Sequence, residues 1–270
     1  MNELLANPAV QGGAAPFVAG LIASVLLGRF RLGGLAVVAA FATAVYFVAG
    51  FGFSSLNATR KIILIGLAAP LVGVVVDFAF RPTRLGAYLL AIAGAACAAW
   101  VFWPVLSQKE LGRALLPGAV AVIASAWIVG FSERRLAADS VRAGAAGLAL
   151  GAGSGVAAIL AASLSYGLYG ISVAAGSGAF LLAQMVTGKR SYAGATFTLS
   201  ATAVAALIAA AVMILAQLPW YSVVVLALVP VAANLRVPAG AALWLQAVLS
   251  SLYGLAVAAI ACALAWHAGG

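Results

Sequence analysis

Long apolar stretches alternate with short polar gaps along the chain from Pro16 to Trp266. The hydrocarbon core of a bilayer is about 30 Å thick, and about 20 residues of α-helix cross it. The chain offers about ten stretches of that length. The pattern therefore predicts an all-α membrane protein, a polytopic bundle of about ten transmembrane helices. The predicted spans cover residues 10–28, 33–53, 62–80, 85–105, 114–131, 142–164, 167–187, 193–217, 219–235 and 238–266.

The composition agrees with this pattern and limits what else the chain can contain. Hydrophobic residues make up 66% of the 270 residues and charged residues only 7%, whereas soluble domains carry about 25% charged residues. The spans leave only short connections, so we expect a single transmembrane domain over residues 1–270 and no soluble domain. The net charge of +9 comes from basic residues in the connections, where they meet lipid headgroups. The expected partner is therefore the lipid bilayer, and nucleic-acid binding is not expected.

Basic residues are unevenly divided between the two sets of connections. Connections after odd-numbered spans hold ten Lys or Arg residues and those after even-numbered spans hold four, which accounts for all 14. Cytoplasmic loops carry the excess of Lys and Arg. We therefore expect the odd connections in the cytoplasm and both termini on the periplasmic or extracellular side. The abundance of Ala, Gly and Val favours a bacterial protein in the inner membrane.

Two internal repeats are compatible with ten spans. An odd number of spans per half gives an inverted repeat of five plus five, as in many secondary transporters. Alternatively, Pro16, Pro117 and Pro219 begin the first, fifth and ninth spans at offsets of 101 and 102 residues. That spacing indicates a parallel repeat of four helices with a final extra pair. Both hypotheses stay open.

The sixth and seventh spans are rich in glycine. Gly147, Gly151 and Gly155 are four residues apart and share one helical face. Small residues at this spacing let two helix backbones approach closely, so the motif predicts tight helix packing. The alternative is a flexible or broken helix that lines a substrate path.

Asp77 is an acidic residue inside a predicted span. Carboxylates within the membrane are expensive to bury, which makes each one a candidate for function. Asp77 is therefore a candidate for coupling to a proton or a cation. Arg81 follows four residues later, at ion-pair spacing, so a local ion pair is the competing explanation.

Uncharged polar residues extend this candidate path. Thr198 and Thr202 share one face of the eighth span, and Ser177 and Gln184 lie in the seventh. Such groups commonly form hydrogen bonds between helices, and they can also line a pocket for a neutral or zwitterionic solute. The predicted substrate path consists of Asp77, Ser177, Gln184, Thr198 and Thr202.

The sequence offers no pattern for catalysis or for a cofactor. Cys97 and Cys262 lie singly in apolar stretches, and His267 is the only histidine, so no metal or redox motif is expected. Paired carboxylates and phosphate-binding loops are also lacking from the sequence. We therefore expect a protein that is not an enzyme, with no catalytic residue, metal or cofactor.

Two functions fit these observations. Many spans, glycine-rich helices and one intramembrane acid are typical of a secondary transporter or permease for a small solute. The alternative is a non-catalytic integral-membrane subunit or assembly factor of a larger complex. In that case partner membrane subunits, or further copies of this chain, cover an exposed face of small residues.

Overall fold

The protein is an all-helical membrane bundle. The computed structural model describes residues 7–52, 56–80, 83–238 and 240–269, and these ranges contain helices but no strand. Within them, eight helices are long and apolar enough to cross a membrane. They are η1 with α2 (Val10–Ala14 and Ala15–Leu27), α4 (Ala58–Ala79), α5 (Arg84–Leu106), α6 (Leu111–Arg135), α7 (Ser140–Leu160), α8 (Leu164–Thr187), α9 (Gly194–Leu215) and α12 (Leu243–Gly269).

Two further segments that were predicted to span the membrane are helical but short. The second predicted span contains α3 (Leu35–Val48), whose 14 residues extend for about 21 Å at 1.5 Å per residue. The ninth is divided into α10 (Trp220–Leu226) and α11 (Val229–Ala233), with Pro230 in the first turn of α11. Proline has no backbone N–H to continue a helix, which accounts for a break there. The structure thus supports eight spanning helices and not the full count of about ten.

The end of α3 is fixed by backbone conformation and by a neighbouring arginine. Gly50 has a φ of +62°, and its N–H donates to Val45 O over 2.9 Å, a common way for a helix to stop. The Arg60 guanidinium donates to Gly50 O over 3.0 Å and to Ala49 O over 3.3 Å. A cation at these carbonyls also complements the negative end of the helix dipole.

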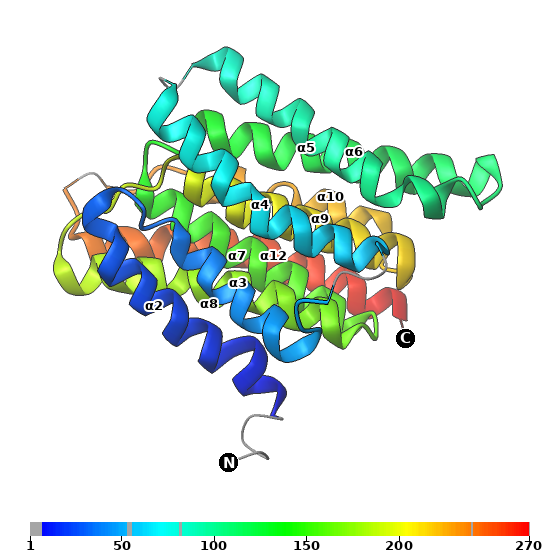
Figure 1. Ribbon diagram of the computed structural model, residues 1–270, viewed down its shortest axis with the longest axis horizontal. Helices are drawn as coiled ribbons and strands as arrows, with labels where there is room; N and C mark the ends of the chain where they lie inside the picture. Colours follow the sequence, from blue (N-terminus) through cyan, green and yellow to red (C-terminus); the bar gives the residue numbers. More distant parts are fainter. Residues whose placement is uncertain (1–6, 53–55, 81–82, 239, 270) are drawn as a thin grey trace.

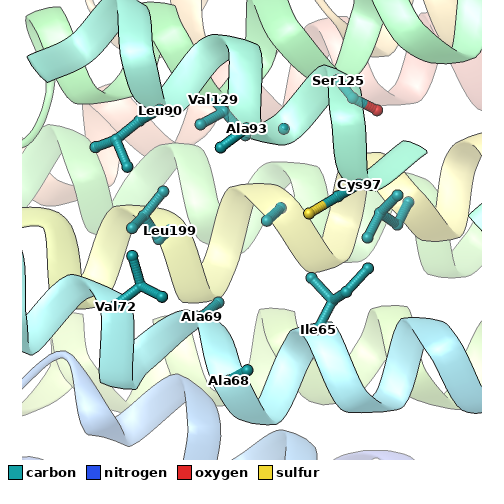
Figure 2. Close-up of a pocket in the computed structure, with 13 residues that line it drawn as sticks. Ile65, Ala68, Ala69, Val72, Leu90, Ala93, Cys97, Ser125, Val129 and Leu199 are labelled. Atoms are coloured by element: carbon teal, nitrogen blue, oxygen red, sulfur yellow. The ribbon is translucent and has the colours of Figure 1, made fainter. Parts of the chain in front are cut away.

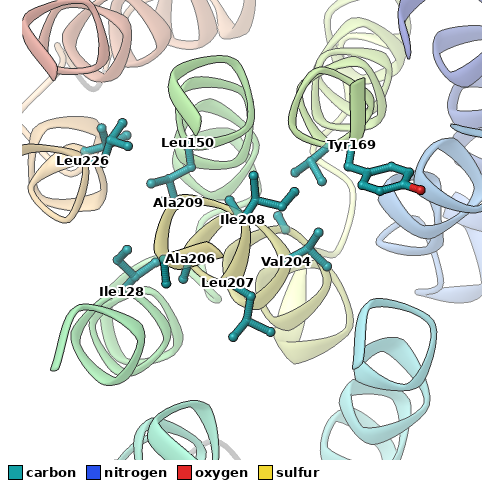
Figure 3. Packing of buried hydrophobic residues seen from close by; sticks show 14 of the residues in the cluster. Ile128, Leu150, Tyr169, Val204, Ala206, Leu207, Ile208, Ala209 and Leu226 are labelled. Atoms are coloured by element: carbon teal, nitrogen blue, oxygen red, sulfur yellow. The ribbon is translucent and has the colours of Figure 1, made fainter. Parts of the chain in front are cut away.

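Helix α9 occupies the centre of the bundle. Twenty of its 22 residues are buried, and its main neighbours are α4, α6 and α7. Figure 3 looks along the helices and shows side chains that surround α9, including Ile128 of α6, Leu150 of α7 and Leu226 of α10. A helix that other helices cover on all sides forms the core of such a bundle.

Helices α5 and α6 form a hairpin at the edge of the bundle. Figure 1 shows this hairpin along the upper edge of the molecule. Only four of the 23 residues of α5 are buried, and α5 packs mainly against α6, which in turn packs against α9. Most of the surface of α5 is therefore available to lipid.

Charged residues define two ends of the bundle. At the end that we call the basic end, the last turns of α4, α6 and α8 meet the first turns of α7 and α9, with Arg31, Arg134, Arg142 and Arg190 around them. The opposite end carries Arg60, Lys61 and Lys109. Both described ends of the chain lie toward the opposite end, since η1 packs near the start of α8 and the second half of α12 contacts the second half of α7.

Candidate functional site

Asp77 caps the start of α9 from the neighbouring helix α4. Its carboxylate accepts hydrogen bonds from Ala195 N at 2.7 Å, Thr196 N at 2.8 Å and Thr196 Oγ1 at 2.7 Å. The N-cap position of α9 is Ala193, which has no side-chain acceptor of its own. An acidic side chain at this place satisfies free N–H groups and complements the positive end of the helix dipole. Asp77 therefore joins α4 to α9.

Two glycines make this close contact possible. A Cβ atom added to Gly73 would lie 2.5 Å from Thr196 Cα, so α4 and α9 touch through their backbones at this point. Gly194 has a φ of +59°, and an added Cβ would lie 2.4 Å from Asp77 Oδ2. Any larger side chain at Gly194 would displace the carboxylate from the helix start.

Tyr192 completes the surroundings of Asp77. Its hydroxyl donates to Asp77 Oδ1 over 3.2 Å, and the Arg31 guanidinium lies 5.8 Å from the centre of its ring. Burial and, after it, the negative charge of Asp77 raise the pKa of Tyr192, with a smaller contribution from Glu133. The hydroxyl therefore stays protonated at neutral pH and remains a donor to Asp77.

A second carboxylate reaches the start of α9 from the other side. Glu133 lies in the last turn of α6 and forms a hydrogen bond with Thr198 Oγ1. Gly194 O lies 2.8 Å from Thr198 Oγ1 and is a second acceptor for the single proton of this hydroxyl. Glu133 was not among the predicted site residues, because the predicted span ended at residue 131 and Glu133 fell in the loop after it. Its spacing of four from Val129 and eight from Ser125 continues one face of the helix and was the available signal.

A groove lies between α4 and the α5–α6 hairpin, with α9 as its floor. Its volume is about 170 Å³. Figure 2 shows side chains of α4 on one side, side chains of α5 and α6 on the other, and Leu199 of α9 between them. The lining is apolar apart from the Ser125 hydroxyl and the Cys97 thiol. The lining residues are Ile65, Ala68, Ala69, Val72, Leu90, Ala93, Gly94, Cys97, Ser125, Val129, Leu199, Ala203 and Leu207.

Polar contacts hold the hairpin beside this groove at the opposite end. Lys61 Nζ donates to Trp100 O over 3.0 Å and lies 4.7 Å from the centre of the Trp100 ring. Trp100 O is free to accept because Pro104, four residues later, has no N–H. Lys109 Nζ donates to Ile214 O, near the end of α9, over 3.1 Å. At the basic end, the hydrogen bond between Glu133 and Thr198 joins α6 to α9. The hairpin is therefore attached at both ends of the groove.

The groove leads toward the two carboxylates. Along α4, Ala69 lines the groove, and Gly73 and Asp77 follow at spacings of four on the same face. Along α6, Val129 lines the groove and Glu133 follows one turn later. Toward the basic end, Asp77 thus lies two helical turns beyond the groove residue Ala69, and Glu133 lies one turn beyond Val129.

The structure brings only part of the predicted substrate path together. Asp77 and Thr198 both lie at the start of α9 without a hydrogen bond between them, and Thr202 follows one turn later and donates to Thr198 O over 2.6 Å. Ser177 and Gln184 lie on α8 instead. None of these five residues lines the groove. Arg81, the predicted ion-pair partner of Asp77, lies outside the described residues.

Gln184 joins three segments at the basic end. Its Oε1 accepts from Ser140 Oγ over 2.7 Å and from Ser191 N over 3.2 Å, and its Nε2 donates to Phe180 O over 3.3 Å. The residue is fully buried. These bonds attach the end of α8 to the start of α7 and to the segment before α9.

Ser177 differs from Gln184, because its buried hydroxyl has no hydrogen-bond partner in the described part of the chain. It packs against α7, where a Cβ atom added to Gly147 would lie 2.6 Å from Ser177 Oγ. Further along, Cβ atoms added to Gly151 and Gly155 would lie 2.4 Å from Ala174 N and 2.7 Å from Ile171 N. Both α7 and α8 run without a break, and their backbones touch along this row of glycines.

The described residues contain no group of three or more His, Cys, Asp and Glu side chains placed to hold a metal ion. Cys97 and Cys262 are free thiols on different helices, and His267 lies in the last turn of α12. No protein-family model, curated protein or solved structure gives a significant match to this chain.

Proposed function

We propose that this multi-pass membrane protein is a permease or secondary transporter for a small solute, with no catalytic role. The observation that carries the proposal is the groove between α4 and the α5–α6 hairpin, with Asp77 and Glu133 on the same helices one to two turns beyond its lining. Its apolar walls suit the apolar part of a solute. The two carboxylates favour a cationic or hydrogen-bond-donating group at the basic end. The solute is therefore amphipathic.

Movement of the hairpin would open and close this path. The hairpin is attached at the ends of the groove through Lys61, Lys109 and Glu133, while α5 has little contact with α4 and α9. Sliding of α6 along α9 would separate Glu133 from Thr198 without disturbing Asp77. Small shear movements of packed helices are a common way to change access to a site.

We also propose that the basic end faces the cytoplasm of a bacterium, following the positive-inside rule. Both chain termini then face the periplasm or the exterior. Fusion of a reporter that is active only in the cytosol tests this placement. Activity of a carboxy-terminal fusion would contradict it.

Uptake by proteoliposomes tests the transport proposal. The probe is phenyltrimethylammonium, an amphipathic cation whose fixed charge prevents passive diffusion. We expect protein-dependent uptake that falls at least about fivefold in Ala203→Phe, since the larger side chain fills the floor of the groove. Ala96→Phe is the matched control, because Ala96 lies on the exposed face of α5 and does not line the groove.

The two native cysteines provide a binding assay that does not depend on transport. Cys97 lines the groove, whereas Cys262 lies on α12 and contacts Gly153 O. We expect phenyltrimethylammonium to slow the reaction of Cys97 with a membrane-permeant maleimide and to leave Cys262 unchanged. Equal effects on both thiols, together with no uptake, would contradict the proposed path.

A role as a non-catalytic subunit or assembly factor of a larger membrane complex is the second candidate. The observation in its favour is the exposed face of α5, which includes Ile92, Ala96, Trp100 and Trp103 and offers a surface for a partner helix. Purification in mild detergent separates the two functions. Stoichiometric recovery of another membrane subunit, lost in Ala96→Phe, would favour this second role over transport.

A further inference from the structure

A second pocket, separate from the groove, lies at the basic end between the start of α7, the segment after α8 and the start of α12. Its volume is about 170 Å³, several times the volume of about 30 Å³ that one water molecule takes in the liquid. Polar side chains provide most of its lining, in contrast to the groove. They are Asp139, Arg142, Arg190, Gln246 and Ser250.

Two guanidinium groups and one carboxylate give this pocket a positive charge. Arg190 Nη1 donates to Asp139 Oδ1 over 3.0 Å, and Arg142 Nε lies 3.5 Å from Asp139 Oδ2. Each arginine also has a second anchor. Arg190 Nη2 donates to Gln246 Oε1 over 2.6 Å, and Arg142 Nη1 donates to Asn234 Oδ1 over 2.9 Å. Both guanidiniums are therefore held in place beside the pocket before any ligand arrives.

The arginines retain donors for a ligand. A guanidinium has five N–H groups, and the contacts above involve two nitrogens of each arginine. Arg142 and Asp139 have about 29% of their side-chain surface exposed and Arg190 about 48%, so the cluster is partly open. Two anchored guanidiniums with spare donors match the flat, bidentate geometry with which arginine binds phosphate oxygens. Gln246 and Ser250, four residues apart on one face of α12, add uncharged polar groups to the same wall.

We propose that this pocket binds a phosphate-bearing anion. The inference is independent of the proposed transport, because the pocket shares no residue with the groove. The phosphate can belong to the headgroup of an anionic lipid or to a soluble molecule. Basic pockets between transmembrane helices at the cytoplasmic level are known to bind the headgroups of anionic lipids.

The experiment uses the purified full-length chain in detergent and two kinds of probe. Native mass spectrometry measures retention of dioleoyl phosphatidylglycerol against dioleoyl phosphatidylcholine. Thermal unfolding measures stabilisation by inorganic phosphate and by glycerol 3-phosphate against chloride at equal ionic strength. Retention of phosphatidylglycerol without a response to the soluble anions assigns the site to a lipid, and the reverse result assigns it to a soluble ligand. Binding of none of these probes by the folded protein would overturn the proposal.

Variants connect the binding to the pocket. We expect Arg190→Gln to weaken binding at least about tenfold, because it removes charged donors while Asp139 keeps Arg142 as a partner. Arg84→Gln is the matched control. It removes one charge from the exposed first turn of α5, at the same end of the bundle but outside the pocket, and should change binding less than about twofold. Equal losses in both variants would show general surface attraction and would overturn the proposal.

A conservative variant decides the question if Arg190→Gln does not give folded protein. Arg190→Lys keeps the positive charge beside Asp139 but loses the planar pair of donors. We expect a loss of binding of at least about threefold with unchanged thermal stability in the absence of ligand. Unchanged binding in Arg190→Lys would contradict recognition by the guanidinium.

Discussion

Two pairs of adjacent helices in this bundle are held together by different means. Helices α7 and α8 touch through glycine backbones, with Gly151 and Gly155 against the facing helix. The α5–α6 hairpin packs on the bundle through α6 against α9 and is joined by polar groups at its two ends, while a groove separates α5 from α4. Backbone contact over a row of glycines leaves little room for change, whereas a few hydrogen bonds at the ends of a hairpin can break and form again. The α7–α8 pair is therefore closely packed along its length, whereas α5 has little contact with α4 and α9.

The largest effect is expected from adding one methyl group between α7 and α8. In Gly151→Ala the new Cβ would lie 2.4 Å from Ala174 N, so the helices must separate at a cost of about 1–3 kcal/mol in the free energy of unfolding. Gly112→Ala is the matched control, since nothing lies within 4 Å of its added Cβ in the first turn of α6. Helix propensity alone would leave that variant unchanged or up to about 1 kcal/mol more stable. Unfolding in a mixed-micelle titration measures the free energy of unfolding of both variants. Equal values would contradict close backbone packing between α7 and α8.

Asp77→Asn is expected to have the next largest effect. The amide retains one acceptor oxygen but places an NH₂ group against donors of α9, and it loses the charge at the helix start. We expect a loss of about 1–2 kcal/mol in the free energy of unfolding. Glu110→Gln, an exposed acidic residue in the connection between α5 and α6, is the control and should leave stability unchanged. Loss of phenyltrimethylammonium uptake with normal stability would instead indicate that Asp77 takes part directly in coupling.

Lys61→Met tests the attachment of the α5–α6 hairpin at the opposite end. The change removes the bond to Trp100 O and the contact with the Trp100 ring, with an expected loss of about 1 kcal/mol. The same change should also loosen the packing of α5 beside the groove, where Cys97 lies. We expect Cys97 to react about two- to fivefold faster with a maleimide while Cys262 keeps its rate. If both thiols change together, Lys61 stabilises the whole bundle and has no particular role at its edge.

The smallest effect is expected at a hydroxyl in the groove. Ser125 Oγ is buried without a hydrogen-bond partner in the described ranges, so Ser125→Ala should leave stability unchanged or raise it by less than about 1 kcal/mol. Ser140→Ala makes the same chemical change where the hydroxyl donates to Gln184 Oε1 over 2.7 Å, and should cost about 1 kcal/mol. Thermal unfolding of the two variants side by side gives the sign of each effect. A clear loss in Ser125→Ala would point to a role for that hydroxyl in the groove.

Apolar runs in the sequence are sufficient to predict the helices, because bilayer thickness sets their length. They do not reveal that α3 stops at Val48, since that end depends on the positive φ of Gly50 and on Arg60 from another helix. They also do not predict which helix becomes the centre. Helix α9 resembles its neighbours in composition, and its burial follows from how all the others pack.

Only part of the candidate site could be predicted from the sequence. Asp77 stood out because charge is rare in a span, but its partners on α9 lie more than 100 residues away. Glu133 was placed in a loop because its neighbours Arg134 and Arg135 suggested the end of a helix. The acceptor for Lys61 exists only because Pro104 frees a carbonyl on a helix that happens to lie beside it. Such contacts depend on tertiary packing, which periodicity along one helix does not encode.

The shortness of α3 also affects the surrounding lipid. A helix of about 21 Å leaves about 9 Å of an average hydrocarbon layer unmatched, and the Arg60 guanidinium lies at that end. A bilayer meets such a mismatch by thinning locally or by admitting water and headgroups. We expect the annulus beside α2 and α3 to be enriched in shorter acyl chains, and reconstitution into thinner membranes to suit this flank of the protein best.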